Sequence, residues 1–461
     1  MKNKKILLKN AYILSMSPGG TVYEDGHVLI EGDTIIDVGH FDLDKTLAVD
    51  EVLDLKGKYV LPGLINTHVH TSQQISRGVG DDVKFETWLH DRMWPFESNL
   101  NFEDSYVSTL LCCLELIKSG VTSFAEAGGQ YVDAMAKAVT ETGLRAKLSK
   151  SVMDTGVGLP DNWQLTADQE LAAQVELYEK FNNTADGRID VWFGLRTLFN
   201  NSEDLILRTK ELADKYNTGI HMHVAEAKSE VEYAVEKYGM QTVSFLNKLG
   251  VLDKNLLAVH SVWLDDDEID MYVDHDVKVS HNPASAMRVL GFAKIPKMLE
   301  KGVCVTIGTD GASSSNRMDI VDEMWLTSII HKGWRLDPTV VKAEEILRMV
   351  TSDGARALLS EDQFGSLEKG KKADLIIINP NDPSMMPVND KIAALVTAMH
   401  STNITHTMCD GKWLMKDRQV LTINEEEVLA EAQVRADAVY KRAGITLRER
   451  FPVERPVVSN I

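Results

Sequence analysis

The sequence lacks the marks of several protein classes. It has four cysteines in 461 residues and no Cys-x-x-Cys pair, which argues against a disulfide framework or a thiolate zinc site. It has no apolar run long enough to span a membrane, and the early run at residues 6–8 is cut short by Lys9 and Asn10. It is also poor in bases, with 49 Lys and Arg against 69 acids and a net charge of -20, which disfavours nucleic acid and anionic membranes as partners. We therefore expect a cytoplasmic protein with reduced cysteines and a small-molecule substrate.

What is present fits a large globular enzyme. Hydrophobic residues make up 44% of the chain and charged residues 26%. The first 60 residues contain short strand-like runs separated by glycine turns, at residues 6–8, 28–30, 34–38 and 52–55. From Val60 onward, apolar runs rich in β-formers alternate with amphipathic helical stretches. Such alternation is typical of a parallel (β/α)8 barrel.

Eight strands and the helices around them can be predicted from this alternation. The expected strands are Val60–Asn66, Val121–Ala125, Ala146–Val152, Ile189–Leu195, Gly219–His223, Leu256–His260, Val277–His281 and Val303–Gly308. The expected helices are Phe102–Lys118, Val132–Thr142, Ala167–Phe181, Ser202–Tyr216, Val231–Leu249, Asp265–Asp274, Ile295–Lys301, Asp319–His331 and Ala343–Leu358.

Strand-like runs return after Gly365, at residues 373–378, 392–396, 404–408 and 412–415. Since both ends of the chain are β-rich, we expect them to meet as one small domain. The predicted fold is a (β/α)8 TIM barrel over residues 60–364. A small β-sandwich domain is expected from residues 1–59 and 365–461, with a surface helix near residues 425–442.

The barrel strands carry polar residues that suggest a metal site. In an extended strand, residues two apart face the same side, so His68 and His70 aim two imidazoles at one point. Alone, this pair could be two loop histidines. However, His223, His260 and Asp310 also follow predicted strands, and the carboxyl ends of barrel strands converge. Burying five such groups without a metal or other partners is costly, so we expect a metal centre.

Several motifs resemble the amidohydrolase superfamily. They are Pro62–His70, His223-Val224-Ala225-Glu226, Val259-His260, Ser280–Pro283 and Gly308–Asp310, with Gly365–Leu375 at the re-entry into the β domain. Within the superfamily, the chain is most similar to the branch of s-triazine hydrolases and 5'-methylthioadenosine/S-adenosylhomocysteine deaminases.

The resemblance implies one divalent transition metal per chain, zinc or iron, held by His68, His70, His223 and Asp310. The fourth strand is followed by Arg196 rather than a lysine that could bridge two metals. His260 is similar to the histidine that contacts the metal-bound water, and in some relatives it counts as a further ligand. Glu226 is similar to the family's proton-transferring acid.

This assignment agrees with hydrolytic chemistry. A metal can generate hydroxide at neutral pH, and Asp310 can take the proton of the water. A protonated Glu226 can donate to a ring nitrogen, and His260 can stabilise the tetrahedral intermediate. Asp310 can then pass its proton to the leaving group.

Residues for substrate binding are less specific. Trp94-Pro95-Phe96-Glu97 resembles a deaminase segment whose glutamate contacts the substrate, although Glu97 could also be a solvated loop acid. Arg196 replaces a histidine that touches the nucleoside in those deaminases. This argues against a nucleoside and for a substrate that bears an acceptor group. His281 and Trp163 could line the pocket or serve in packing.

We therefore expect a metal-dependent hydrolytic deaminase of an amino-substituted heterocycle or cyclic amidine, acting through metal-bound hydroxide. One alternative keeps the fold and removes chloride or alkylamine from a triazine-like ring. Another is an inactive binding barrel stabilised by a metal, which intact Glu226 and Asp310 argue against. We also expect a homo-oligomer.

Overall fold

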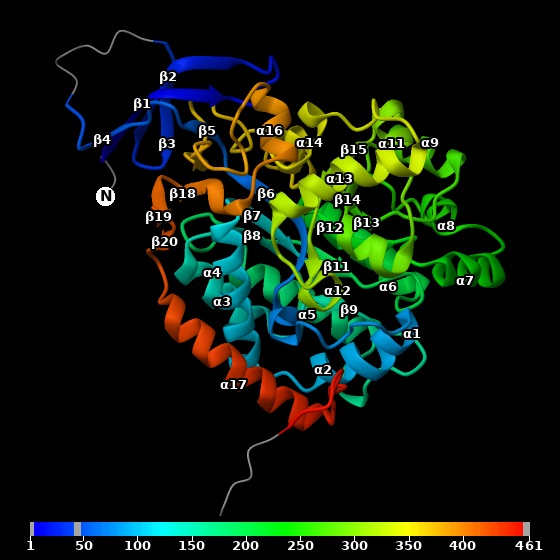
Figure 1. The fold of residues 1–461 in the computed structure, drawn as a ribbon. Helices are drawn as coiled ribbons and strands as arrows, with labels where there is room; N and C mark the ends of the chain where they lie inside the picture. The colour runs from blue at the N-terminus through cyan, green and yellow to red at the C-terminus, as the bar shows by residue number, and fades with distance from the viewer. Residues whose placement is uncertain (1–3, 41–47, 455–461) are drawn as a thin grey trace, which may run out of the picture.

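The computed structural model describes residues 4–40 and 48–454, and it brings an early segment, residues 5–62, and a late segment, residues 375–420, into one sheet (Figure 1). This nine-stranded sheet has the order β20-β19-β18-β17-β5-β1-β2-β3, with β4 paired to β1. Antiparallel pairing of β17 with β5, where Ile376 faces Leu61, joins the late strands to the early ones. The strands are β1 (Lys5–Leu14), β2 (Val22–Glu31), β3 (Thr34–Gly39), β4 (Glu51–Asp54), β5 (Tyr59–Pro62), β17 (Leu375–Ile378), β18 (Ile404–Cys409), β19 (Lys412–Lys416) and β20 (Gln419–Val420).

The remaining strands form two sheets in which every pair is parallel, as predicted for an α/β chain. One has the order β10-β8-β7-β6-β16 and the other β15-β14-β13-β12-β11-β9. The first contains β6 (Leu64–His70), β7 (Val121–Glu126), β8 (Arg145–Leu148), β10 (Ile189–Val191) and β16 (Asp310–Gly311). The second contains β9 (Ser151–Val152), β11 (Phe193–Leu195), β12 (Ile220–Val224), β13 (Leu256–His260), β14 (Lys278–His281) and β15 (Cys304–Ile307).

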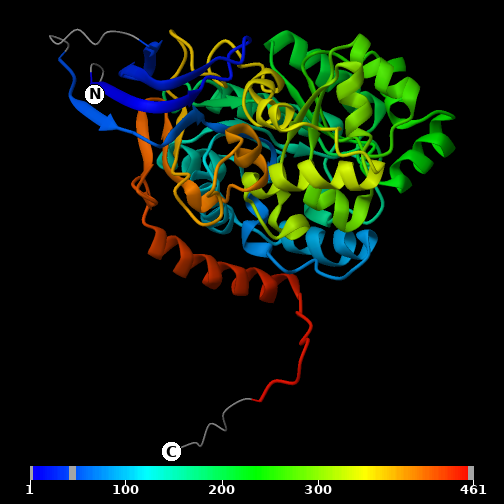
Figure 2. The same cartoon turned by 45° about the horizontal axis from the view of Figure 1, so that its top comes forward.

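Helices surround these parallel strands, and the long α17 lies on the outside of the molecule (Figure 2). The larger ones are α3 (Phe102–Lys118), α4 (Val132–Thr142), α5 (Ala167–Phe181), α6 (Glu203–Tyr216), α7 (Lys228–Tyr238), α8 (Thr242–Lys248), α9 (Asp266–Asp274), α11 (Ile295–Lys301), α13 (Ile320–Arg335), α14 (Ala343–Met349), α15 (Ser352–Ala357), α16 (Lys391–Thr397) and α17 (Glu425–Ala443). Within the described residues, no helix combines the length and apolar character that a membrane span requires.

Short elements shape the loops beyond the strands. They are η1 (Thr71–Ser76), α1 (Phe85–Trp88), η2 (Leu89–Met93), α2 (Trp94–Ser98), η3 (Asp161–Trp163), α10 (Pro283–Ser285), η4 (Ala286–Leu290), α12 (Ala312–Ser315) and η5 (Ser401–Asn403).

Three details of the predicted elements were wrong. Residues 392–396 were expected as a strand but lie in α16, which begins where the Asp390 side chain accepts hydrogen bonds from the Ile392 and Ala393 amides. The single helix expected at 231–249 is two helices, because the chain turns at Gly239 with a left-handed φ of 72°. The helix expected at 343–358 is likewise divided into α14 and α15.

The first barrel strand was also placed too early, at Val60–Asn66. The structure has β5 in the terminal sheet and β6 among the parallel strands, with Gly63 between them. An added Cβ at Gly63 would lie 2.1 Å from Thr122 Oγ1, so only glycine permits this approach of backbone to side chain. The shift matters because both His68 and His70 now lie inside β6.

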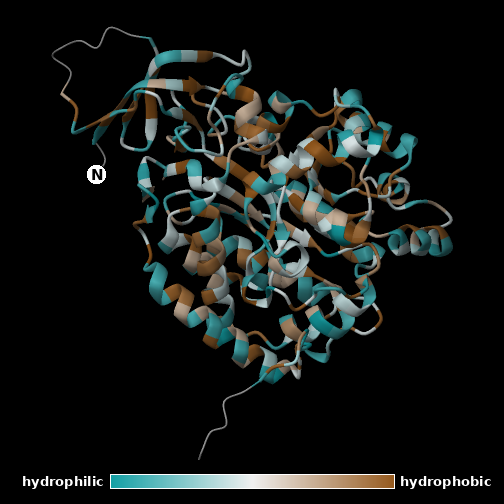
Figure 3. Ribbon diagram, in the orientation of Figure 1, coloured by the Kyte–Doolittle hydropathy of each residue, from teal (hydrophilic) through white to brown (hydrophobic). Residues whose placement is uncertain are grey.

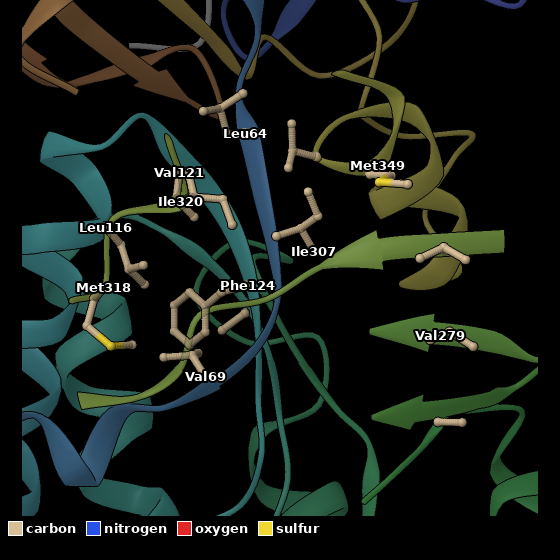
Figure 4. Packing of buried hydrophobic residues seen from close by; sticks show 14 of the residues in the cluster. Leu64, Val69, Leu116, Val121, Phe124, Val279, Ile307, Met318, Ile320 and Met349 are labelled. Atoms are coloured by element: carbon tan, nitrogen blue, oxygen red, sulfur yellow. The ribbon is translucent and has the colours of Figure 1, made fainter. Parts of the chain in front are cut away.

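The core positions the end of β6. Figure 4 shows Val69 beside Phe124, on the side of β6 where Leu116 and Met318 also pack. Because side chains alternate along a strand, His68 and His70 face the opposite side from Val69. Hydrophobic residues in Figure 3 concentrate on these inner strands, whereas α7 on the periphery is largely hydrophilic.

Candidate metal centre

Five of the predicted site residues come together at the carboxyl ends of the strands. Single donor atoms of His68, His223 and His260 lie within 4.8 Å of one another, and so do those of His68, His70 and Asp310. All five side chains are buried. They come from β6, β12, β13 and β16, elements that are far apart in the sequence.

A chain of hydrogen bonds determines which ring nitrogen of His68 carries the proton. His221 Nδ1 lies 3.1 Å from the backbone oxygen of Glu126, which can only accept, so His221 carries its proton there. His221 Nε2 must then accept, and it lies 2.9 Å from His68 Nδ1. His68 is therefore protonated on Nδ1. Its Nε2, a buried atom with no hydrogen-bond partner among the described residues, presents a lone pair to the centre.

His223 and His70 present further nitrogens to the same point. His223 Nδ1 lies 2.9 Å from the backbone oxygen of Arg196, which fixes the proton on Nδ1 and leaves the lone pair on Nε2. This Nε2 lies 3.3 Å from His70 Nε2. Burial, followed by the charge of Arg196, lowers the pKa of both histidines well below the usual value, which favours neutral rings. A cation between these nitrogens would relieve their crowding.

His260 is oriented differently. Asn282 Nδ2 lies 3.1 Å from His260 Nδ1 and 3.4 Å from the backbone oxygen of Ser280. The second contact requires the amide nitrogen on this side, so Asn282 donates and His260 Nδ1 accepts. The ring proton then lies on Nε2, which is 3.6 Å from Glu226 Oε1. His260 thus offers a donor to the centre, whereas a direct ligand would offer a lone pair.

Asp310 supplies the negative charge. Its Oδ1 lies 3.4 Å from His68 Nε2 and 3.5 Å from His70 Nε2, and its Oδ2 accepts a hydrogen bond of 2.7 Å from Ser285 Oγ. Burial alone would raise the pKa of this carboxyl, but the neighbouring His68, His260 and His70 side chains lower it far below the usual range. Asp310 has a left-handed φ of 61°, which is a strained conformation for a residue with a side chain.

This donor set fits a divalent transition metal. Three imidazoles and one carboxylate are ligand types that zinc accepts, and the buried lone pair on His68 Nε2 has no hydrogen-bond partner in the described chain. Around a bound metal, each ligating imidazole is usually neutral and donates its other ring N–H to a second protein group. The observations support a divalent metal here.

Glu226 lies beside the donors on the loop after β12. Burial raises the pKa of its carboxyl, with the charge of His260 acting in the opposite direction. The loop is held by Glu230, whose buried carboxyl accepts hydrogen bonds of 3.0 and 3.1 Å from the Ala225 and Glu226 amides. Ala225 has a φ of 48°, so Glu230 maintains a strained turn that directs Glu226 toward the centre.

Arg196 separates two cavities. The metal-side cavity is lined by His70, His223, Glu226, His260, Asp310 and Arg196. The second cavity is lined by Ser72, Glu97, Gln130, Met153, Trp163 and Arg196. Arg196 is 8% exposed, and its guanidinium forms no ion pair or hydrogen bond within residues 4–40 and 48–454. It is a buried cation that lines both spaces and acts on the Glu97 and Glu226 carboxyls through its charge alone.

Glu97 is buried rather than solvated. Gln73 Nε2 donates to its Oε1 at 2.9 Å, and burial raises the pKa of the carboxyl, with Arg196 opposing. Trp163 lines the same second cavity. His281 instead turns toward α13, where its Nε2 lies 3.1 Å from His331 Nε2, so the structure does not bring it to the centre.

Sequence reasoning missed several residues that hold the site. His221, Asn282, Glu230 and Ser285 each fix the orientation of a predicted site residue. Signals existed for two of them: His221 precedes His223 by two positions and therefore shares its face of β12, and Asn282 lies within the Ser280–Pro283 motif. Glu230 and Ser285 are ordinary polar residues that no motif marks.

Comparison with known proteins agrees with this picture. The sequence profile described as the amidohydrolase family matches residues 59–414. The chain is 40% identical to a 5'-deoxyadenosine deaminase of Methanobrevibacter smithii, over 94% of this chain and 98% of that protein. It is 36% identical to a 5-methylthioadenosine/S-adenosylhomocysteine deaminase of Pelotomaculum thermopropionicum, over 94% of this chain and 98% of the relative. The crystal structure of an adenosine deaminase from Xanthomonas campestris with bound zinc has a TM-score of 0.90 and 27% identity, covering 95% of this chain and 99% of that one.

Proposed function

The chain belongs to the amidohydrolase family, and we propose that it deaminates an adenosine-type nucleoside such as 5'-deoxyadenosine. At the coarser level it is a metal-dependent deaminase that hydrolyses a C–N bond of a cyclic amidine, as predicted. Full-length relatives at 36–40% identity carry deaminase names that specify adenosine nucleosides. The observation that carries the chemistry is the cluster of buried, neutral imidazoles beside a carboxylate and a protonatable glutamate.

The metal in this proposal is one zinc ion per chain, held by His68, His70, His223 and Asp310. The lone pairs deduced for His68 and His223 support their assignment as ligands. A metal at this centre would act as a Lewis acid and lower the pKa of a water molecule to about 7. The proton on Nε2 favours His260 as a hydrogen-bond donor rather than a fifth ligand.

Glu226 and Asp310 divide the proton transfers. Asp310, held ionised, accepts the proton of the attacking water. Glu226, whose pKa burial raises, is protonated in a larger fraction of molecules and donates to a ring nitrogen, which makes the neighbouring carbon electrophilic. His260 Nε2 donates to the oxygen that becomes negatively charged as the water adds. Return of a proton to the amino group then releases ammonia.

Arg196 and Glu97 are proposed to bind the substrate beyond the reacting carbon. The sequence alone argued against a nucleoside because Arg196 replaces a histidine. A purine nucleoside nevertheless has ring nitrogens and ribose oxygens that can accept from a guanidinium, and such an acceptor would satisfy the unpaired cation. Glu97 in the second cavity is suited to bind the ribose hydroxyls. The buried Arg196 guanidinium has no ion pair or hydrogen bond in the part of the chain that the structure describes, which supports a contact with substrate.

The finer architecture is also inferred. Residues 145–152 contribute to both parallel sheets, as do residues 189–195 and 304–311. Thr309 N donates to the backbone oxygen of His68 and Gly308 N to that of His281, so the eighth strand bonds to neighbours on both sides. We infer that the two sheets close into one (β/α)8 barrel over residues 60–364. We also infer that the nine-stranded sheet folds over its own apolar cluster as a β-sandwich formed by residues 1–59 and 365–461.

The test is ammonia release by the zinc-loaded protein. The panel contains 5'-deoxyadenosine, 5'-methylthioadenosine, a 2-aminopterin and an aminotriazine. We expect efficient release from the nucleosides and at least 100-fold lower kcat/KM for the pterin and triazine. Efficient release from the triazine alone would favour the alternative reaction. No release from any substrate by a protein that retains metal would contradict a deaminase.

A further inference from the structure

A third cavity lies next to Glu226, and Arg196 does not line it. It shares Glu226 with the metal-side cavity, and Phe85 and Trp88 line both spaces, so these two rings form the wall between them. The rings stack with their centroids 5.9 Å apart. The proposed function assigns the metal, the purine and the ribose to the other two cavities, which leaves this space without a role.

The inner end of the third cavity reaches the two groups that transfer protons in the proposed mechanism. Glu226 lines the cavity directly, and so does Ser285, whose Oγ donates to Asp310 Oδ2 at 2.7 Å. In the proposed reaction, the exocyclic amine is bonded to the carbon next to the ring nitrogen that Glu226 protonates, and Asp310 supplies the proton with which it leaves. An amine that meets both requirements lies at the inner end of this cavity.

The outer end of the cavity opens to water. Val289 in η4 lines the wall and is 45% exposed, whereas Ser285 is buried. Arg288 donates from Nη2 to Asp81 at 2.6 Å and from Nη1 to the backbone oxygen of Ser314. These bonds join the long loop after β6, the loop after β14 and α12 around the opening. An amine released at the inner end therefore has a path to solvent that avoids the cavity lined by Arg196.

Two local features of the chain shape the wall. A Cβ at Gly80 would lie 2.2 Å from Trp88 Cδ1, so the indole packs against backbone that only glycine leaves free, and its Nε1 donates to the Ser313 backbone oxygen at 3.3 Å. On the other side, the Gly291 amide donates to the Ala286 backbone oxygen at 2.9 Å, an i to i+5 bond of a π-helical turn. Such wide turns are rare and frequently occur at functional sites.

The size of the cavity restricts what can occupy it. Its free volume is about 20 Å³, which is room for one water molecule. A methyl group is only slightly larger than a water molecule, whereas a carbon that bears two methyl groups is much larger. Phe85, Trp88 and Val289 present apolar surface to such a methyl group, and the hydroxyls of Ser285 and Ser314 can accept from departing ammonia.

On the basis of the proposed function, we infer that the third cavity is a leaving-group pocket and that the protein also hydrolyses N6-methylated adenosine nucleosides, releasing methylamine. Water supplies the oxygen that becomes the carbonyl of the purine ring. The bond between the ring carbon and the exocyclic nitrogen breaks, and its electron pair leaves with methylamine. Of the two hydrogens of the water, one ends on the ring nitrogen beside Glu226 and the other on the amine, so no further reactant is needed.

The test compares three nucleosides on the zinc-loaded protein. 5'-Deoxyadenosine and its N6-methyl and N6-isopropyl derivatives give the same deaminated product, so one assay measures all three. We expect kcat/KM for the methyl derivative to lie within about tenfold of that for 5'-deoxyadenosine, and kcat/KM for the isopropyl derivative to be lower by about 100-fold or more. Methylamine measured by chromatography should equal the nucleoside product formed.

Two substitutions in the wall should shift this preference in opposite directions. Ser314→Leu fills the pocket and should lower the ratio of kcat/KM for the methyl derivative to that for 5'-deoxyadenosine by roughly 30-fold. Val289→Ala enlarges the pocket and should raise the corresponding ratio for the isopropyl derivative by about tenfold. Val273→Ala, at a valine on α9 that is 40% exposed, is the matched control and should change neither ratio. Ratios cancel any damage common to all substrates, and metal content and melting temperature verify the fold.

The outcomes separate this pocket from the proposed function. Equally poor turnover of the methyl and isopropyl derivatives, or a Ser314→Leu protein that loses activity on all three nucleosides by the same factor, would overturn the leaving-group pocket while leaving the deaminase in place. If 5'-deoxyadenosine itself is not deaminated, the proposed function is wrong and the pocket inferred from it is wrong as well.

Discussion

Two clusters of buried charged groups lie at opposite ends of the parallel strands, and they differ in how completely their atoms are paired. At the amino end, Arg145 donates from Nε to Asp374 at 2.6 Å and from Nη2 to Asp410 at 2.5 Å. The Asp410 amide also donates to Asp374, and Lys372 lies 3.5 Å from Asp410. At the carboxyl end, several histidine nitrogens and the Arg196 guanidinium lack such partners among residues 4–40 and 48–454.

The difference separates a structural role from a functional one. Buried charges are tolerated when they are paired, and the Arg145 cluster joins β8 to the sheet formed by the two chain ends. At the metal centre, the cost of burying polar and charged groups is not offset by pairing within the described chain, and binding of a metal and a substrate would offset it. The predictions below disturb each cluster in turn.

Removal of a proposed ligand should have the largest effect. His68→Ala should lose the metal and reduce deamination below detection, since the centre then lacks one of four donors. Metal analysis of the purified proteins should give about one zinc per chain in wild type. The exposed His275→Ala should retain both metal and activity. Full activity in a metal-free preparation would contradict this assignment.

Glu226→Gln should leave the metal in place and slow turnover. Glutamine keeps the shape of the side chain but cannot cycle a proton, so kcat should fall by about 10²–10⁴. Metal content and the dissociation constant of a non-reactive nucleoside should change little. If kcat remains within tenfold of wild type while the metal is retained, another group transfers the proton.

Substitution of the two buried arginines compares the clusters directly. Arg145→Met leaves Asp374 and Asp410 without their main partner and should lower the free energy of unfolding by about 3–5 kcal/mol. Arg196→Met removes an unpaired cation, so stability should be unchanged or higher, while KM rises at least tenfold. Urea denaturation and steady-state kinetics measure the two effects. Equal destabilisation by both substitutions would contradict a structural role for Arg145 and a functional role for Arg196.

The smallest effect concerns Glu230 and pH. Burial raises the pKa of its carboxyl to about 7, above the usual 4.5, because the charged form is poorly solvated. A raised carboxyl pKa means that the folded protein binds the proton more tightly, so this stabilisation is present at low pH and is lost as pH rises through 7. Glu230→Gln keeps a neutral side chain. The melting temperature of wild type relative to this variant should therefore fall between pH 5 and 8, and a constant difference would contradict the shift.

Much of the fold could be predicted because local signals were strong. The bounds of α3, α4, α5 and α11 agree with those expected from periodicity, and α3 and α5 begin at the capping boxes of Asn101 and Thr166. The strand predicted at residues 392–396 was wrong because a short apolar run is equally compatible with a strand and a helix. There, the cap at Asp390 and the surrounding tertiary contacts decided for a helix.

The sequence by itself determined which donors stand at the strand ends, since the two-residue period of a strand fixes that His68 and His70 share a face. It also determined the acidic net charge of -20. Only the tertiary structure decided which nitrogen of each histidine carries a proton, because His68 depends on His221, which lies 153 positions away. It likewise decided that Arg145 is paired, whereas Arg196 has no ion pair among the described residues. Both arginines lie near parallel strands, and only the folded chain brings two aspartates to Arg145 and places Arg196 in the lining of a cavity.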